Sequence, residues 1–127
     1  MKYGYKRKVP LPFGEAVENV RSELSKEGFG VLTEIDVKAT LKKKLGIEHD
    51  NYLILGACNP PFALKALQAE KDIGLLMPCN VIVYEDGGKV FVSAVMPTVA
   101  MRVVGNTSLA EAGKTVEEKL KKVVDNV

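Results

Sequence analysis

Alternating apolar and polar residues predict strands in the N-terminal half of the chain, and helical spacing predicts the elements between them. The alternation over residues 2–9 is typical of a strand with one solvated face. A helix is expected from Phe13 to Lys26, and Gly28 lies where it would end. Alternation resumes over residues 29–37 and predicts a second strand.

A short helix is predicted next, over residues 38–45, and Gly46 lies at its end. Its apolar residues Leu41 and Leu45 are expected to face inward. The run of lysines at 42–44 is best explained as a solvated helix face, because no aromatic residues interleave with it to stack on nucleic-acid bases.

The C-terminal half begins with a compact apolar strand over residues 52–57. Asn59 is then expected to cap a helix that begins at Pro60, where the missing N–H of proline costs nothing. Two further strands, 81–84 and 90–95, flank an Asp-Gly-Gly turn and should form an antiparallel hairpin. A long amphipathic helix is predicted to follow from Ser108, which would form a capping box with Glu111.

This order of elements predicts a single α+β domain over residues 1–127, with a largely antiparallel sheet covered on one face by helices. The other face of the sheet would then need a cover. Because several strands carry Tyr and Val, a second copy of the chain is a reasonable cover, and we expect a homodimer.

Composition narrows the class of protein. Hydrophobic residues make up 46% of the chain and charged residues 27%, as in ordinary globular proteins. The net charge of +2 is too small to favour nucleic acid as a partner. Neither a secretory signal nor a run of apolar residues long enough to span a membrane is visible, so a cytoplasmic location and no membrane partner are expected.

The candidate chemistry lies in two similar segments, Gly56-Ala57-Cys58-Asn59-Pro60 and Met77-Pro78-Cys79-Asn80. Each places a Cys-Asn pair beside proline at the border of an apolar run, and together they hold both cysteines of the chain. If the two strand ends converge, two thiols and two amides would surround a small ligand or a soft metal ion, or the thiols would pair as a reversible disulfide. Packing cysteines and turn-forming asparagines are the plainer explanation of the same residues.

Cys58 is the more interesting thiol, because the positive end of the helix that follows it favours a thiolate. Glu85 is a candidate acid or base if it lies near the thiols. The apolar connection 96–101 is a candidate pocket wall. No Cys-x-x-Cys pair, Cys/His set of zinc-ligand spacing or known catalytic signature is present, so the sequence assigns no metal ligands, cofactor or reaction.

The segments 28–36, 56–60, 63–67, 74–81 and 83–85 together make the chain similar to the domain-of-unknown-function family numbered 302. The resemblance covers nearly the whole chain. It implies a compact α+β fold with a curved antiparallel sheet, similar to the arrangement of the TATA-binding protein, and dimers, but no activity. The Asp that the family often has before the last proline is replaced here by Met96, so no role of a carboxylate at that position is carried over.

Three functions remain open on these grounds. The first is a homodimer that binds a small ligand or a soft metal near Cys58, Asn59, Met77, Pro78, Cys79, Asn80 and Glu85. The second is a thiol-dependent enzyme or redox switch that uses Cys58. The third is an interaction module in which both cysteines only pack.

Overall fold

One open antiparallel sheet organises the molecule. The computed structural model describes residues 2–127. The five strands lie in the order β1-β5-β4-β3-β2, and every neighbouring pair is antiparallel. The strands are β1 (Gly4–Val9), β2 (Gly30–Asp36), β3 (Tyr52–Cys58), β4 (Cys79–Asp86) and β5 (Lys89–Val95). The predicted α+β class with an antiparallel sheet is confirmed, and so is the hairpin, whose Gly87 and Gly88 both have positive φ.

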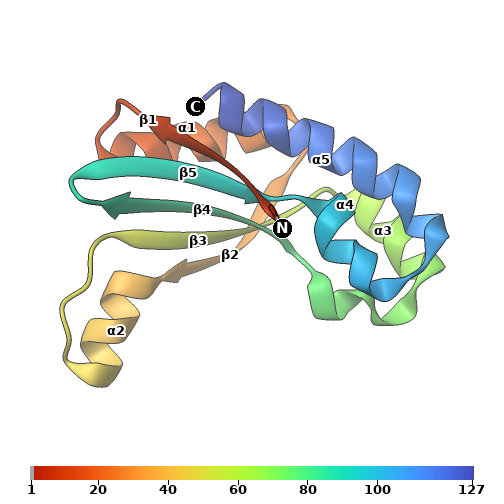
Figure 1. Ribbon diagram of the computed structural model, residues 1–127, viewed down its shortest axis with the longest axis horizontal. Helices are drawn as coiled ribbons and strands as arrows, with labels where there is room; N and C mark the ends of the chain where they lie inside the picture. The colour runs from red at the N-terminus through yellow and green to blue at the C-terminus, as the bar shows by residue number, and fades with distance from the viewer. Residues whose placement is uncertain (1) are drawn as a thin grey trace.

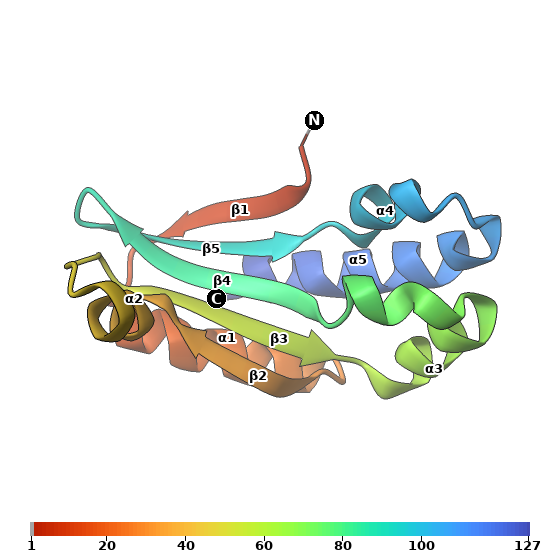
Figure 2. The ribbon, with the colours of Figure 1, turned by 90° about the horizontal axis from the view of Figure 1, so that it is seen from below.

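Two long helices, α1 (Phe13–Lys26) and α5 (Ala110–Asp125), lie side by side on one face of the sheet (Figures 1 and 2). The helix α2 (Val37–Leu45) projects at one end of the sheet. At the other end lies the helical lobe, which consists of α3 (Pro60–Ala69), α4 (Pro97–Ala100) and the 3-10 helices η1 (Lys71–Leu76), η2 (Met101–Val104) and η3 (Thr107–Leu109). None of the helices in residues 2–127 combines the length and the apolar character needed to cross a membrane.

The main core lies between the sheet and its two covering helices. Successive side chains of a strand point to opposite faces, so β3, β4 and β5 each direct every second residue toward α1 and α5. Leu55, Val83 and Val92 are completely buried there. The helices contribute the apolar residues at helical spacing, including Val20, Leu24, Leu120 and Val123.

Within residues 2–127 no helix covers the opposite face of the sheet (Figure 2). This face carries a row of aromatic side chains. Tyr52, Tyr84 and Phe91 stack across three strands, with ring centroids 5.3 and 5.4 Å apart. Lys6 extends the row, because its Nζ lies 5.3 Å from the Phe91 centroid and donates a hydrogen bond to the Tyr84 hydroxyl. We call this surface, with Ile54 and Ile82 beside the row, the open face.

The position of α2 differs from the sequence-based expectation. No residue of α2 is buried, and Leu45, expected to face inward, is 66% exposed. The helix itself forms as predicted, with Asp36 accepting a hydrogen bond from the Ala39 N–H and Gly46 ending it in the left-handed conformation. The predicted inward orientation is wrong for Leu45, whereas Leu41 is half-buried, because the helix leaves the end of the sheet and only part of it lies against the strands (Figure 1).

The start of α5 also differs from the prediction. Ser108 does not cap the helix. It lies within a 3-10 turn that precedes α5, and the Asn106 side chain accepts a hydrogen bond from the Ser108 N–H. The apolar stripe of the helix is buried as expected, including Val116, Leu120 and Val123. The pattern therefore predicted the covering face of the helix but not its start, because the N-cap residue of α5 is Leu109 and the side-chain cap belongs to Asn106 of the preceding 3-10 turn.

The outer strand β2 has an irregularity in its pairing with β3. The register shifts between Val31 and Thr33, which leaves Leu32 without a partner residue on β3. Such a bulge bends a strand and increases its local twist.

Candidate functional site

The two Cys-Asn segments meet at adjacent ends of β3 and β4. Ala57 pairs with Cys79 across the two strands, and Cys58 is the next residue of β3. Both thiols are free and half-buried. Cys58 and Cys79 are 21 positions apart in the sequence, but the antiparallel pairing of β3 with β4 brings them together. Both thiols lie in the wall of one cavity.

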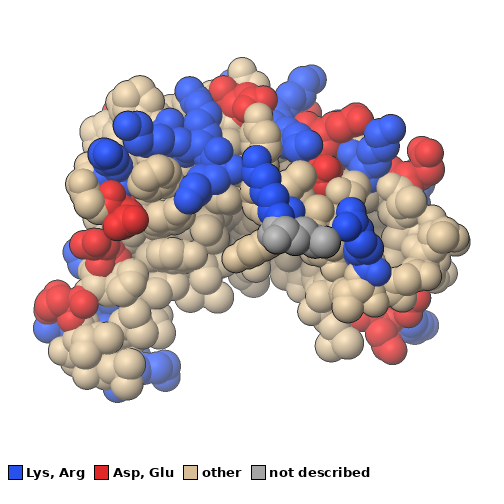
Figure 3. Space-filling model, viewed as in Figure 1, with Lys and Arg blue, Asp and Glu red and all other residues tan. Residues whose placement is uncertain are grey.

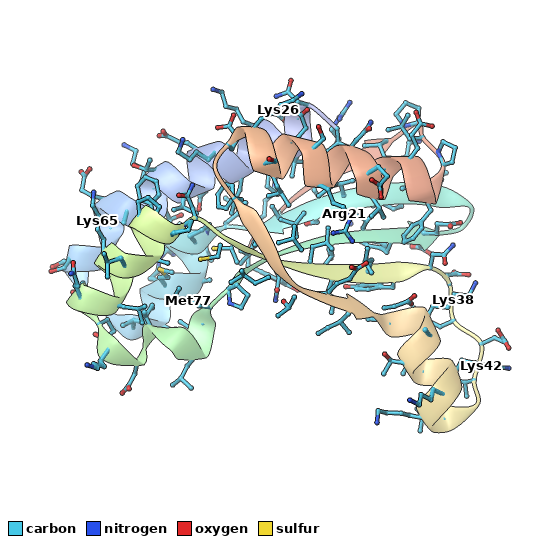
Figure 4. The ribbon with its side chains drawn as sticks, turned by 180° about the vertical axis from the view of Figure 1, so that it is seen from behind. Arg21, Lys26, Lys38, Lys42, Lys65 and Met77 are labelled. Carbon is cyan, nitrogen blue, oxygen red and sulfur yellow. The ribbon has the colours of Figure 1, made fainter. Side chains whose placement is uncertain are left out.

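The cavity lies between the sheet end and the helical lobe, is partly open to solvent, and has a volume of about 50 Å³. Figure 4 shows Met77 at this junction of sheet and lobe. Of the residues proposed from sequence, five line the cavity: Cys58, Asn59, Met77, Pro78 and Cys79. The remaining lining residues are almost all apolar and come from every neighbouring element: Phe29, Ala57, Phe62, Ala63, Ala66, Pro97, Met101, Leu109, Ala112, Gly113 and Val116.

Asn59 links the start of α3 to the end of α1 beside the cavity. It lies at the N-cap position of α3, but its side chain makes no capping hydrogen bond. Instead, its Nδ2 donates to the backbone carbonyl of Glu27 at 3.2 Å, and the residue is only 9% exposed. The expected side-chain cap is therefore replaced by a link between α3 and the segment that follows α1.

Gly28 makes room for this link. Its φ is +85°, and a Cβ at this position would lie 3.4 Å from Asn59 Nδ2. Only glycine adopts this backbone conformation without strain, so the turn after α1 and the position of Asn59 depend on it.

The thiol of Cys79 is perturbed by its surroundings. Burial raises the pKa of its thiol to about 11, and the neighbouring Cys58 adds to the increase. A raised pKa keeps the thiol protonated at neutral pH, and the thiolate is the reactive form. Cys79 is therefore a neutral, weakly nucleophilic group at neutral pH.

Pro78 packs closely against the backbone of β3 at Gly56. A Cβ on Gly56 would lie 2.7 Å from Pro78 Cγ and 2.1 Å from Thr33 Oγ1, closer than atoms can approach. Glycine at position 56 thus lets the proline ring and the threonine pack directly on the β3 backbone. This contact positions the residue that precedes Cys79.

Two of the residues proposed from sequence lie elsewhere. Asn80 is exposed and does not line the cavity. Glu85 lies near the opposite end of β4, about 20 Å along the strand from Cys79, and accepts a hydrogen bond from Asn51 Nδ2 at 2.6 Å. A carboxylate at that distance cannot exchange a proton with the thiols directly.

Met101 and Phe62 line the cavity but were not chosen from sequence as ligand-binding residues. The connection that contains Met101 was recognised as a candidate wall because of its apolar composition. Phe62 gave no such signal, since an apolar residue at helical spacing looks the same whether it packs in a core or beside a cavity.

The cavity is unlike a conventional metal centre. Within residues 2–127 no group of three or more His, Cys, Asp or Glu side chains could hold an ion. Its polar groups are the two thiols and the Asn59 amide, set among apolar side chains. Such an arrangement can hold a neutral molecule by contact and orient it through few polar groups, or hold an ion through sulfur.

Comparison with known proteins places the chain in a family. A search among curated proteins found no match. A crystal structure of an uncharacterized conserved protein DUF302 from Bacillus stearothermophilus is similar over 99% of this chain and 98% of that chain, with a TM-score of 0.93 and 28% sequence identity. The family model "Domain of unknown function DUF302" matches residues 5–127. The chain therefore belongs to the DUF302 family.

Proposed function

We propose that this domain binds a small ligand or a soft metal ion in the cavity at the ends of β3 and β4, and that it does so as a homodimer. The observation that carries the binding proposal is the cavity itself. Five residues from the two Cys-Asn segments line it, and apolar residues of the helical lobe close it. A mostly apolar pocket with a few convergent polar groups is the usual form of a binding site.

The binding proposal is tested by titrating isotope-labelled protein with dimethyl sulfide, a neutral apolar probe, and following the backbone amides by NMR. The amides of Cys58, Asn59 and Cys79 should shift. Ala112→Leu should abolish these shifts because it fills the cavity from α5, whereas Ala110→Leu, exposed on the same helix, should leave them unchanged. Shifts that are absent in the wild type, or that persist in Ala112→Leu, would contradict binding in this cavity.

The homodimer proposal is supported by two apolar surfaces that lie beside each other. In Figure 3 the molecule is hollowed below the sheet, between α2 and the helical lobe, and the wall of the hollow is largely uncharged. Leu45 and Ile47, at the end of α2 and just after it, are 66% and 48% exposed, and Ile35 of the neighbouring β2 is 48% exposed. A two-fold axis would place α2 of each copy in the hollow of the other, since one surface then supplies both partners.

The test of the dimer is the mass of the protein in solution, measured by light scattering during size-exclusion chromatography. The wild type should have the mass of two chains and Leu45→Glu the mass of one, because a carboxylate would be buried in the interface. Ala110→Glu places the same charge on an exposed position of α5 and should remain a dimer. A monomeric wild type, or a dimeric Leu45→Glu variant, would contradict the proposal.

A second candidate function is a redox switch, which the position of two free thiols on one cavity favours. Oxidised glutathione would accept two electrons and two protons from Cys58 and Cys79, which would form one disulfide and release two molecules of glutathione. Mass spectrometry should then find the chain lighter by two hydrogen atoms. Glutathione attached to Cys58 as the final product, or no reaction in the native state, would exclude the switch.

A further inference from the structure

Sulfur is concentrated at one place in this molecule. The chain has two cysteines and four methionines. Both cysteines and two of the methionines, Met77 and Met101, line the same cavity. They come from separate parts of the chain: the end of β3, the segment that leads into β4, and the start of η2.

The size of the cavity limits it to an ion or a very small molecule. Pockets that enclose organic ligands of drug size have volumes of roughly 300 to 1,000 Å³, and a cavity of about 150 Å³ is needed even for benzene. The volume of this cavity is about 50 Å³. It accommodates one ion or a molecule of a few atoms without movement of the helical lobe.

The donor atoms decide which ion. No carboxylate or imidazole lines the cavity, so hard cations such as Mg²⁺ and Ca²⁺ have no suitable ligands there. Structural zinc sites use four Cys or His ligands, which the lining residues do not supply. Thiolate and thioether sulfur together are the ligands that select monovalent copper.

From these observations we infer that the cavity is a site for one monovalent copper ion, bound by the thiolates of Cys58 and Cys79 with thioether sulfur from Met77 and Met101. The inference deepens the proposed binding function and rests on it. On binding, each thiol releases one proton to solvent and forms one copper–sulfur bond, while the oxidation state of copper does not change. The resulting two-thiolate complex has a net charge of −1.

The surroundings can accommodate that charge. Helix α3 begins at Pro60, two residues after Cys58, so the positive end of its dipole lies beside the site. The Asn59 side chain fixes the start of this helix through its hydrogen bond to Glu27. The apolar residues around the sulfurs limit the access of water and of oxidants.

The inference is tested by anaerobic titration of the reduced protein with Cu(I) in competition with bicinchoninate, a coloured Cu(I) chelator. Native mass spectrometry of the same samples gives the stoichiometry. One copper per chain should bind, with the loss of two protons. Binding of Zn²⁺ as tight as that of Cu(I), or no binding of Cu(I) by the wild type, would overturn the inference.

Variants separate the roles of the sulfur ligands. Cys58→Ser and Cys79→Ser should each weaken Cu(I) binding by more than about 100-fold, since even residues outside the ligand shell change metal affinity by about 10- to 100-fold. Met101→Leu keeps the size of the side chain and removes its sulfur, and it should weaken binding by about tenfold. Met96→Leu is the matched control and should bind like the wild type, because Met96 does not line the cavity.

The outcomes distinguish this inference from the function on which it rests. If Cu(I) does not bind but dimethyl sulfide still shifts the amides of the cavity, the copper site is wrong and the ligand pocket remains. If neither probe binds, both are wrong. Should the cysteine variants fail to fold, equal affinities of Met101→Leu and Met96→Leu for Cu(I) would still contradict coordination by Met101.

Discussion

The two faces of the sheet are made from the same strands but follow different rules. On the covered face, Leu55 and Val83 are completely buried under α1 and α5. On the open face, Ile54 and Tyr84 occupy the positions next to them and are only half-buried. A period of two in the sequence thus separates a surface that stabilises the fold from one that is available for contact with a partner.

The largest expected effect compares two neighbouring residues of β3. Leu55→Ala should lower the free energy of unfolding by about 3 kcal/mol, because it leaves a cavity in a closely packed core. Ile54→Ala should cost about 1 kcal/mol in dilute protein, since its side chain is only half-buried. Urea denaturation followed by circular dichroism measures both. Equal costs would indicate that the open face is buried in solution, which would break the comparison and support the homodimer.

Gly56 is the position where the open face is packed as closely as a core. Gly56→Ala should lower the free energy of unfolding by about 2 kcal/mol, because the new methyl group collides with Thr33 and with the rigid ring of Pro78. The control is Gly30→Ala, since a Cβ on Gly30 would meet nothing within 4 Å. The same denaturation experiment tests the pair, and a harmless Gly56→Ala would show that Pro78 is free to move.

The fold was largely predictable from the sequence because its elements depend on local patterns. Alternation in 2–9, helical spacing in 13–26 and the Asp-Gly-Gly turn each predict an element without reference to the rest of the chain. The position of α2 was not predictable, because an amphipathic pattern shows which residues form an apolar side but not whether a layer lies opposite it. Leu45 is the residue that shows this limit.

The candidate site was predictable only in part, for a similar reason. The register of β3 and β4 brings Cys58 near Cys79, and the repeated Cys-Asn pattern indicated this. The same pattern suggested Asn80, and Glu85 was proposed as a carboxylate at a strand end, but both residues lie outside the cavity. The apolar composition of 96–101 indicated a pocket wall that includes Met101, whereas Phe62 comes from a helix whose packing against the strand ends is set by tertiary structure, which no local pattern reports.

A third prediction concerns alkaline pH at the covered end of β4. The pKa of Cys79 is raised from 9.0 to about 11 in the folded protein, so folding favours the protonated thiol. Its contribution to stability is complete below pH 9 and is lost as the pH rises toward 11. At pH 10 the loss relative to pH 7 should be roughly 1.4 kcal/mol.

Urea denaturation of reduced, metal-free protein between pH 7 and pH 10 measures this loss. Cys79→Ala should reduce the dependence on pH by about that amount, because it removes the titrating group. A wild type and variant with the same dependence would show that water reaches Cys79 as freely as it reaches the open face.

The smallest predicted effect is a gain of stability. Gly113 is the fourth residue of α5, and a Cβ there would meet nothing within 4 Å. Gly113→Ala should raise the free energy of unfolding by about 0.8 kcal/mol, since alanine is the better helix former. Thermal denaturation checks the change. A loss of stability would mean that the helix packs against the cavity more closely than its backbone suggests.

The edges of the sheet have a consequence for how copies of this chain can associate. β1 and β2 are both edge strands, and unpaired edges invite the addition of further strands without limit. The bulge between Val31 and Thr33 interrupts one edge, and Lys6 and Lys8 place charges along the other. Stacking of chains into open-ended fibrils is therefore disfavoured. Association through the open face would stop at two copies, because a two-fold contact buries the same surface on both chains and leaves none for a third.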